Sequence, residues 1–288
     1  MDELVGEAVE RSRQLYDLGE TTIFAANCDP RFHYMLYVPQ AVDEAGSVEL
    51  VVAVHGTGRT SAFEFRQAFI DFAEFHSCAV FCPIFPASVM GDGRRSGYKY
   101  MIENELRYDR LLLAMIAEAS AKYGRDWSRF ALFGYSGGGH FAHRFAILQP
   151  EHLWAVSIGA PGSVTLLDET KDWWVGVRDL ESKFGSKLNL AALKDLPVQM
   201  VVGALDLETW EITHKPGSLY YMDGANDAGE TRIDRLTALA QSFRSAGISV
   251  SLDVVQGVSH DRLSVLPAVK SFLSKTLTEY RSERDGAG

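Results

Sequence analysis

Short apolar runs recur along this chain, and many of the segments between them carry the spacing of amphipathic helices. Five of these runs are largely continuous; they lie at 48–56, 78–86, 129–139, 153–162 and 198–206. A strand with apolar residues on both faces has to be covered on both faces, which is typical of a parallel sheet flanked by helices. The alternation of strand and helix therefore predicts an α/β fold with a mainly parallel central sheet and helices on both faces.

The rest of the chain fits around this sheet. An alternating segment at 32–39 predicts a strand that pairs as a hairpin with the TTIFAA segment before it, and 248–257 predicts the last strand. Helical patterns occupy 1–18, 61–76, 102–123, 140–148 and 229–246, followed by a C-terminal helix. Residues 163–195 break this rhythm with tryptophans among many charges. We expect a single domain over 1–288, with 163–195 as a small cap or lid insertion within it.

Charge and hydropathy narrow the possible partners. The 288 residues include 28 Lys and Arg against 38 Asp and Glu, a net charge of −10. Such a chain lacks the broad cationic surface that phosphate backbones need, so we expect no nucleic acid as its main partner. Its apolar stretches are shorter than a membrane span, and its N-terminus has no apolar core of a signal peptide. We therefore expect a cytoplasmic protein with no membrane span.

The three cysteines point to no special chemistry. An odd and small number, Cys28, Cys78 and Cys82, is not a disulfide framework. Cys78 and Cys82 lie in an apolar run, where we expect them to be buried. No second pair of ligands stands near them, as a zinc site would require, so we expect no metal.

The strongest chemical signal is Gly134-Tyr135-Ser136-Gly137-Gly138. It follows the apolar strand FALF and precedes the helical segment HFAHRFAIL. In this context the G-x-S-x-G pattern indicates a nucleophile elbow, a sharp turn that strains the serine backbone while small neighbours let the chains pass. The hydroxyl then stands free at a helix N-terminus, which favours negative charge. We expect Ser136 to be a nucleophile rather than an incidental serine in a glycine-rich turn.

With this elbow the chain resembles the α/β-hydrolases of the serine esterase and lipase type. That family orders its triad as Ser, then Asp or Glu, then His. Asp206 ends a predicted strand downstream of Ser136, and His260 follows the last predicted strand. The resemblance implies Asp206 as the acid and His260 as the base. Glu208 is the spare acid, whereas Asp261, adjacent to the histidine, would point elsewhere.

The segment His55-Gly56-Thr57-Gly58 resembles the H-G-x-G oxyanion loop of the same family. A tetrahedral intermediate needs N–H donors aimed at its oxyanion. The resemblance implies the backbone amides of Gly137 and Thr57, with Gly58 as the alternative to Thr57, while His55 anchors the loop. The implied chemistry needs no metal and no organic cofactor.

The acyl substrate is left open by the resemblance. Three segments should rise above the carboxyl ends of the strands, at 86–100, 163–195 and 207–228. Their aromatic residues suit an apolar pocket for a small-molecule apolar ester or related acyl substrate. We expect at least one of Trp173, Trp174 and Trp210 to contact it.

The leading hypothesis is a carboxylic ester hydrolase, and several alternatives stay open. An amidase or peptidase and an acyltransferase would pass through the same acyl-enzyme, and a lyase of the hydroxynitrile type uses the same triad. A non-catalytic binding protein on this fold is the alternative from another class, because a fold alone does not establish a function. The oligomeric state is not indicated.

Overall fold

The computed structural model describes residues 2–286, within which nine strands form one sheet. The strands are β1 (Gly19–Glu20), β2 (Phe24–Ala25), β3 (His33–Val38), β4 (Glu49–Val54), β5 (Cys78–Ile84), β8 (Phe130–Tyr135), β9 (Leu153–Gly159), β10 (Val198–Gly203) and β11 (Val250–Val255). Their order is β1-β3-β5-β4-β8-β9-β10-β11, with β2 also paired to β3.

The six strands from β5 to β11 in this order run parallel, and the N-terminal strands close the other edge antiparallel. Every residue of β4, β8, β9 and β10 is buried, as strands covered on both faces must be. The hairpin expected before residue 40 is present, because β2 pairs antiparallel with β3. The prediction of a mainly parallel α/β sheet is confirmed.

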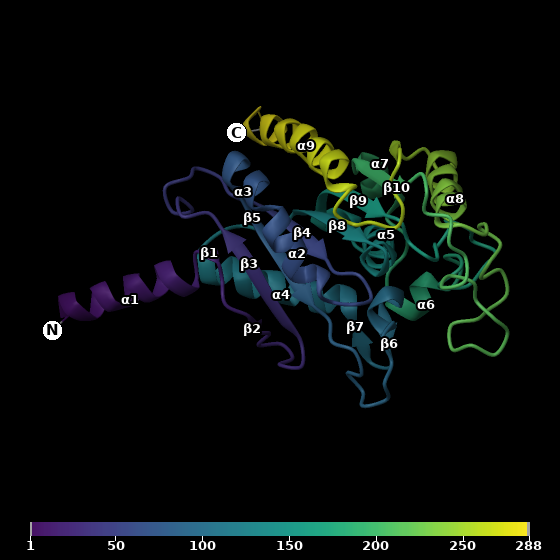
Figure 1. Ribbon diagram of the computed structural model, residues 1–288, viewed down its shortest axis with the longest axis horizontal. Coiled ribbons are helices and arrows are strands. Elements are labelled where there is room, and N and C mark those ends of the chain that lie inside the picture. Colours follow the sequence, from purple (N-terminus) through teal and green to yellow (C-terminus); the bar gives the residue numbers. More distant parts are fainter. Residues whose placement is uncertain (1, 287–288) are drawn as a thin grey trace.

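Helices cover both faces of the sheet (Figure 1). They are α2 (Ser61–Ala68), α3 (Ile70–His76) and α9 (Leu266–Gly286) on one face, and α4 (Tyr108–Tyr123), α5 (Gly137–Leu148) and α8 (Arg232–Ser245) on the other. The connection from β4 leads to β5 on one side of it, and the connection from β5 leads back across β4 to β8 on the other side. Because both crossovers are right-handed but run in opposite directions along the sheet, their helices lie on opposite faces. Contacts across the first face join α9 to α3, where Lys270 Nζ lies 2.6 Å from the Asp71 carboxylate.

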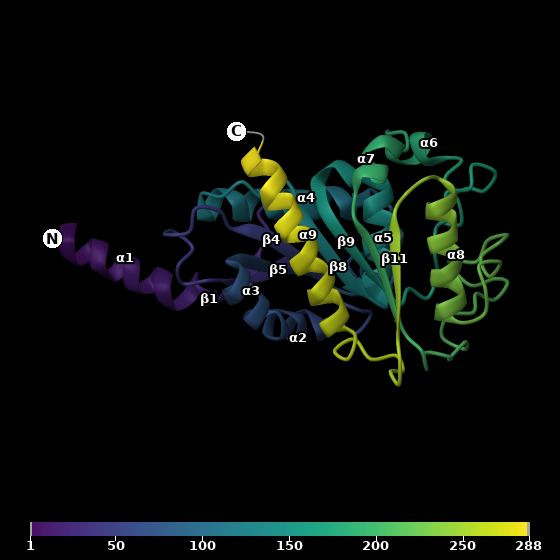
Figure 2. The ribbon, with the colours of Figure 1, turned by 90° about the horizontal axis from the view of Figure 1, so that it is seen from above.

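Shorter elements fill the connections. They are η1 (Gly97–Tyr100), β6 (Ile102–Glu103), β7 (Leu106–Arg107), η2 (Pro150–His152), α6 (Leu180–Phe184) and α7 (Leu190–Asp195). The N-terminal helix α1 (Asp2–Tyr16) extends away from the sheet in both views (Figures 1 and 2). Within residues 2–286, none of the helices is both long enough and apolar enough for a bilayer crossing.

Two predicted helices differ from those in the structure. The helix expected from residue 102 begins only at Tyr108, because β6 and β7 form a small hairpin ahead of it. Asn104 makes the turn with φ +52°, a conformation that asparagine tolerates better than most residues. The helix expected over 61–76 is divided at the buried Phe69, whose backbone leaves helical geometry at φ −97° and ψ 2°.

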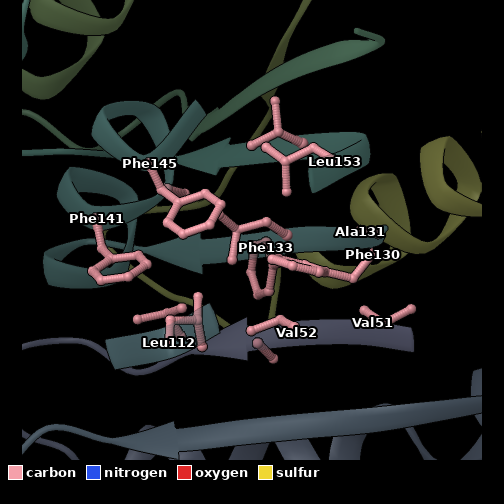
Figure 3. Close-up of a cluster of buried hydrophobic side chains, with 14 of the residues drawn as sticks. Val51, Val52, Leu112, Phe130, Ala131, Phe133, Phe141, Phe145 and Leu153 are labelled. Atoms are coloured by element: carbon pink, nitrogen blue, oxygen red, sulfur yellow. The ribbon is translucent and has the colours of Figure 1, made fainter. Parts of the chain in front are cut away.

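The core holds α5 firmly against the sheet. Figure 3 shows Phe141 and Phe145 of this helix lying over the central strands, near Leu112 of α4 and Phe133 of β8. Every residue of α5 is buried. A fully buried phenylalanine contributes about 1.5–3 kcal/mol relative to an exposed one, so this packing fixes the helix whose first turn begins at Ser136.

Candidate active site

Ser136 occupies the turn between β8 and α5, in a strained backbone conformation. Its φ is +56° and its ψ is −113°, outside the region that non-glycine residues favour. Its N–H donates to the Gly159 carbonyl (2.8 Å), and its own carbonyl accepts from the His140 N–H (3.1 Å). A Cβ on Gly138 would collide with the Val54 carbonyl oxygen, so the crossing of α5 over β4 requires glycine there. These features are those of a nucleophile elbow.

Asp206 and His260 meet beyond the carboxyl ends of two adjacent parallel strands. Asp206 lies three residues past the end of β10, and His260 lies in the loop after β11. His260 Nδ1 and Asp206 Oδ2 are 2.5 Å apart. The Asp206 side chain is fully buried, whereas the His260 side chain is partly exposed. The histidine thus keeps its second nitrogen for another partner.

A third residue, not foreseen from the sequence, completes this arrangement. Arg232, at the first position of α8, donates from Nη1 to Asp206 Oδ1 at 3.0 Å and from Nη2 to Glu211 Oε2 at 2.7 Å. Both oxygens of Asp206 therefore have a charged or polar partner. No sequence motif marks Arg232, because its position depends on how α8 packs against β10.

The rival residues make other contacts. Glu208 accepts a hydrogen bond from the exposed Trp210 indole (2.8 Å). Asp261 accepts from the Leu263 N–H (2.9 Å) and the Ser264 hydroxyl (2.7 Å). Neither is hydrogen-bonded to His260 within residues 2–286.

The loop at 55–58 brings the Thr57 amide beside Gly137. A Cβ placed on Gly137 would lie 2.8 Å from the Thr57 nitrogen. Neither of these two amides has a hydrogen-bond acceptor among the described residues. Two unsatisfied N–H groups next to a strained serine, one of them at a helix N-terminus, form a candidate site for a developing negative charge.

His55 secures this loop, as expected. Its Nε2 accepts from the Phe85 N–H (2.9 Å), and its Nδ1 donates to the Gly56 carbonyl (2.8 Å). Burial lowers the pKa of His55 to about 3, so the ring is neutral and holds this pattern at ordinary pH. Arg59, with φ +64°, ties the loop further by donating to the carbonyls of Thr57 and Phe85.

Two cavities open beside Ser136. The first, here the histidine cavity, has a volume of about 190 Å³; its lining includes His260, Arg262, Tyr135, Gly56 and Thr60. The second, here the lysine cavity, has a volume of about 160 Å³; its lining includes Lys99, Tyr100, His140, His214, Tyr220 and Arg232. Ser136, Thr57 and Glu211 line both. The serine therefore stands between two compartments.

The lysine cavity is more polar than the apolar pocket expected from the sequence. Burial is the main cause that lowers the pKa of Lys99 to about 8 and that of His214 to about 4. His140 is buried in the wall, where its Nε2 accepts from the Gly162 N–H (2.7 Å) and its Nδ1 lies 3.0 Å from the Ser163 hydroxyl. Two of the three segments expected above the strands, 86–100 and 207–228, do reach this cavity.

None of the three candidate tryptophans lines either cavity. Trp173 and Trp174 are buried, and their indole N–H groups donate to the carbonyls of Tyr100 and Tyr220, each at 3.0 Å. They thus support residues of the cavity wall from behind. Trp210 is 75% exposed.

Comparison with solved structures identifies the fold. A poly(aspartic acid) hydrolase from Sphingomonas sp. KT-1 superposes with a TM-score of 0.70 and 18% identity, over 88% of this chain and 97% of that one. A poly(3-hydroxybutyrate) depolymerase from Bordetella parapertussis gives 0.68 and 22%, over 83% and 82%. An S-formylglutathione hydrolase from Agrobacterium tumefaciens gives 0.58 and 16%, over 88% and 92%. The α/β-hydrolase fold expected from the sequence is confirmed. No protein-family model matches the sequence, and no curated protein matches it closely.

Proposed function

We propose that this protein is a serine hydrolase that cleaves carboxylic esters, with Ser136 as nucleophile, His260 as base and Asp206 as the orienting acid. The observation that carries the proposal is the 2.5 Å contact between His260 Nδ1 and Asp206 Oδ2, beside a serine held at positive φ. A carboxylate on Nδ1 favours the tautomer whose Nε2 can accept a proton. The hydrolase and depolymerase activities named for the structural neighbours are in keeping with it.

The reaction follows from these positions. Ser136 Oγ attacks the ester carbonyl while His260 takes its proton, and the amides of Thr57 and Gly137 hydrogen-bond the oxyanion. His260 then gives the proton to the departing alcohol oxygen, which leaves an acyl-serine. Water attacks that acyl group with His260 again as base, and the acid is released.

Arg232 acts as a positioning residue in this scheme. It holds one oxygen of Asp206, so the other oxygen faces the imidazole. The Asp206 side chain is fully buried, and a carboxylate left without a partner there would lower the stability of the fold. The arginine therefore holds the Asp206 carboxylate in place through a charged contact.

Amide hydrolysis and acyl transfer share the acyl-serine and are tested by the choice of substrate. Esters, the matching anilides and a competing alcohol acceptor should be compared at equal concentration. We expect kcat/KM to be highest for the esters, with water as the acceptor. Faster turnover of the anilides, or ester product formed with the added alcohol in preference to acid, would assign one of these alternatives instead.

Covalent labelling tests the nucleophile itself. A fluorophosphonate should react once per chain and map to Ser136, since only a serine with a base and oxyanion donors is strongly nucleophilic. Ser136→Ala should lose both the label and the activity. Ser282→Ala, at an exposed position on α9, is the matched control and should keep both. Label on another serine, with Ser136→Ala still active, would overturn the proposal.

A further inference from the structure

The position of His260 assigns a role to each cavity, if the proposed hydrolysis is correct. The leaving-group oxygen has to receive its proton from this histidine, so the departing alcohol lies on the side where His260 stands. His260 lines the histidine cavity and not the lysine cavity. The acyl part of the substrate therefore occupies the lysine cavity, together with Lys99.

Lys99 has no carboxylate partner in this cavity. Among the described residues no Asp or Glu oxygen lies within 4.0 Å of its ammonium group. Its Cε would lie 3.1 Å from a Cβ placed on Gly137, so the side chain runs beside the oxyanion amide. Glu211 lines the same cavity and its negative charge acts to raise the pKa of Lys99, but that carboxylate is bonded to Arg232.

Three further cations surround the same cavity, also with no carboxylate within 4.0 Å among residues 2–286. Arg144 is fully buried and donates to the Lys99 carbonyl and the Thr165 and Ser163 hydroxyls. Arg235 is buried and donates to the carbonyls of Gly162 and Ile212, both of which line the cavity. Arg59 donates its hydrogen bonds to the backbone carbonyls of Thr57, Phe85 and Arg95.

The four cations near this cavity, Lys99, Arg144, Arg235 and Arg59, contrast with the acidic composition of the chain. The protein as a whole carries a net charge of −10. Arginine stays charged in proteins, and burial at a site sheltered from water strengthens the field of each guanidinium. Arg144, Arg235 and Arg59 use their N–H groups to hold the wall, and Arg232, which lines the cavity, is paired with Asp206 and Glu211. Among the described lining residues, Lys99 is therefore the cation left to meet a ligand.

We propose that Lys99 binds a carboxylate at the far end of the acyl group, so that the substrate is a half-ester of a short dicarboxylic acid. The volume of the lysine cavity, about 160 Å³, limits the length of that acid. At roughly 30 Å³ for each water-sized group, the cavity holds about five non-hydrogen atoms beyond the reacting carbonyl. A succinyl group has two methylenes and a carboxylate there, which matches this size.

Paired esters that differ in one charge test the proposal. Ethyl hydrogen succinate carries the carboxylate, and ethyl 4-methylpentanoate replaces its two oxygens with two methyl groups of similar shape. For the wild-type protein we expect kcat/KM to be at least about tenfold higher for the succinate half-ester, since a charge-assisted hydrogen bond in a sheltered site contributes that much. Lys99→Met should lower this ratio at least about tenfold. Lys275→Met, on the exposed side of α9, is the control and should leave it unchanged.

Binding of the product acid separates this inference from the proposed function. Succinate should bind to Ser136→Ala more tightly than 4-methylpentanoate does, and Lys99→Met in the same background should abolish the difference, as measured by calorimetry. If neither ester is hydrolysed but this binding pattern holds, the esterase proposal fails and the carboxylate site stands. Equal binding of both acids, or a wild-type preference for the neutral ester, would overturn the role of Lys99.

Discussion

Arg232 offers the sharpest test of how the buried Asp206 carboxylate is held. Its side chain is 3% exposed, and it joins the fully buried Asp206 to the half-exposed Glu211. Arg232→Met keeps much of the apolar bulk but removes the charge. One oxygen of Asp206 then stays buried without a partner, while His260 still contacts the other.

The expected loss of stability follows from the two contacts. Removing one partner of a buried ion pair costs about 3–5 kcal/mol. The contact to Glu211 adds little, because an exposed carboxylate regains water and such pairs contribute about 0–1 kcal/mol. Because Asp206 keeps its contact with His260, we expect a loss at the lower end of that range. The free energy of unfolding should fall by about 3 kcal/mol in Arg232→Met.

Urea unfolding at neutral pH, followed by tryptophan fluorescence, measures this change. Glu211→Gln is the control and should cost less than about 1 kcal/mol. In the double variant, Asp206→Asn should recover part of the loss caused by Arg232→Met, because no buried charge is then left unpaired. A loss below about 1 kcal/mol for Arg232→Met, or strictly additive effects in the double variant, would refute the reasoning.

Further outcomes are expected at the other positions. Asp206→Asn should lower kcat on the order of 10³–10⁴-fold through loss of tautomer control, whereas Glu208→Gln should stay near wild type; the reverse result would make Glu208 the acid. The preference for the succinate half-ester over its neutral partner should fall as the pH rises through about 8, because Lys99, with a pKa of about 8, loses its charge there; a ratio that is flat from pH 7 to 9.5 would contradict this. Trp174→Ala should cost about 3–5 kcal/mol of stability as a buried aromatic, and Trp210→Ala less than about 0.5 kcal/mol. If both tryptophan variants keep the wild-type ratio of bulky to small esters, neither residue contacts the substrate.

The residues that meet at the strand ends were predictable because their positions follow from short local patterns. A serine between a buried strand and a glycine-rich helix start has few conformations available, and the structure gives Ser136 a φ of +56°. Asp206 and His260 each follow a strand, and parallel strands bring their carboxyl ends to one edge. Their contact was expected from these positions together with the triad order that the family resemblance implies.

Arg232 and Lys99 were not predictable in this way. Arg232 begins a helix whose capping box, Thr231 with Asp234, is readable, but the direction of its side chain depends on the packing of α8. Lys99 lies in a short helical turn, η1, inside the 86–100 segment, for which the sequence predicts only a position above the strand ends. The small hairpin after η1 was missed for the same reason, since two-residue strands have no periodicity to detect.

Asp206 and His260 follow directly from strands of the sheet, whereas the lysine cavity is lined largely by the connecting segments. β10 and β11 are in register from Val198 with Val250 to Gly203 with Val255, so the loops carrying Asp206 and His260 start from fixed points. The segments that supply Lys99 and Tyr220 are joined to this frame by arginine contacts to backbone oxygens, which do not depend on the side chains of the residues they hold. Substitutions in those segments can therefore change the shape and charge of the cavity while Asp206 and His260 stay in place. The two parts of the site can thus vary independently in sequence.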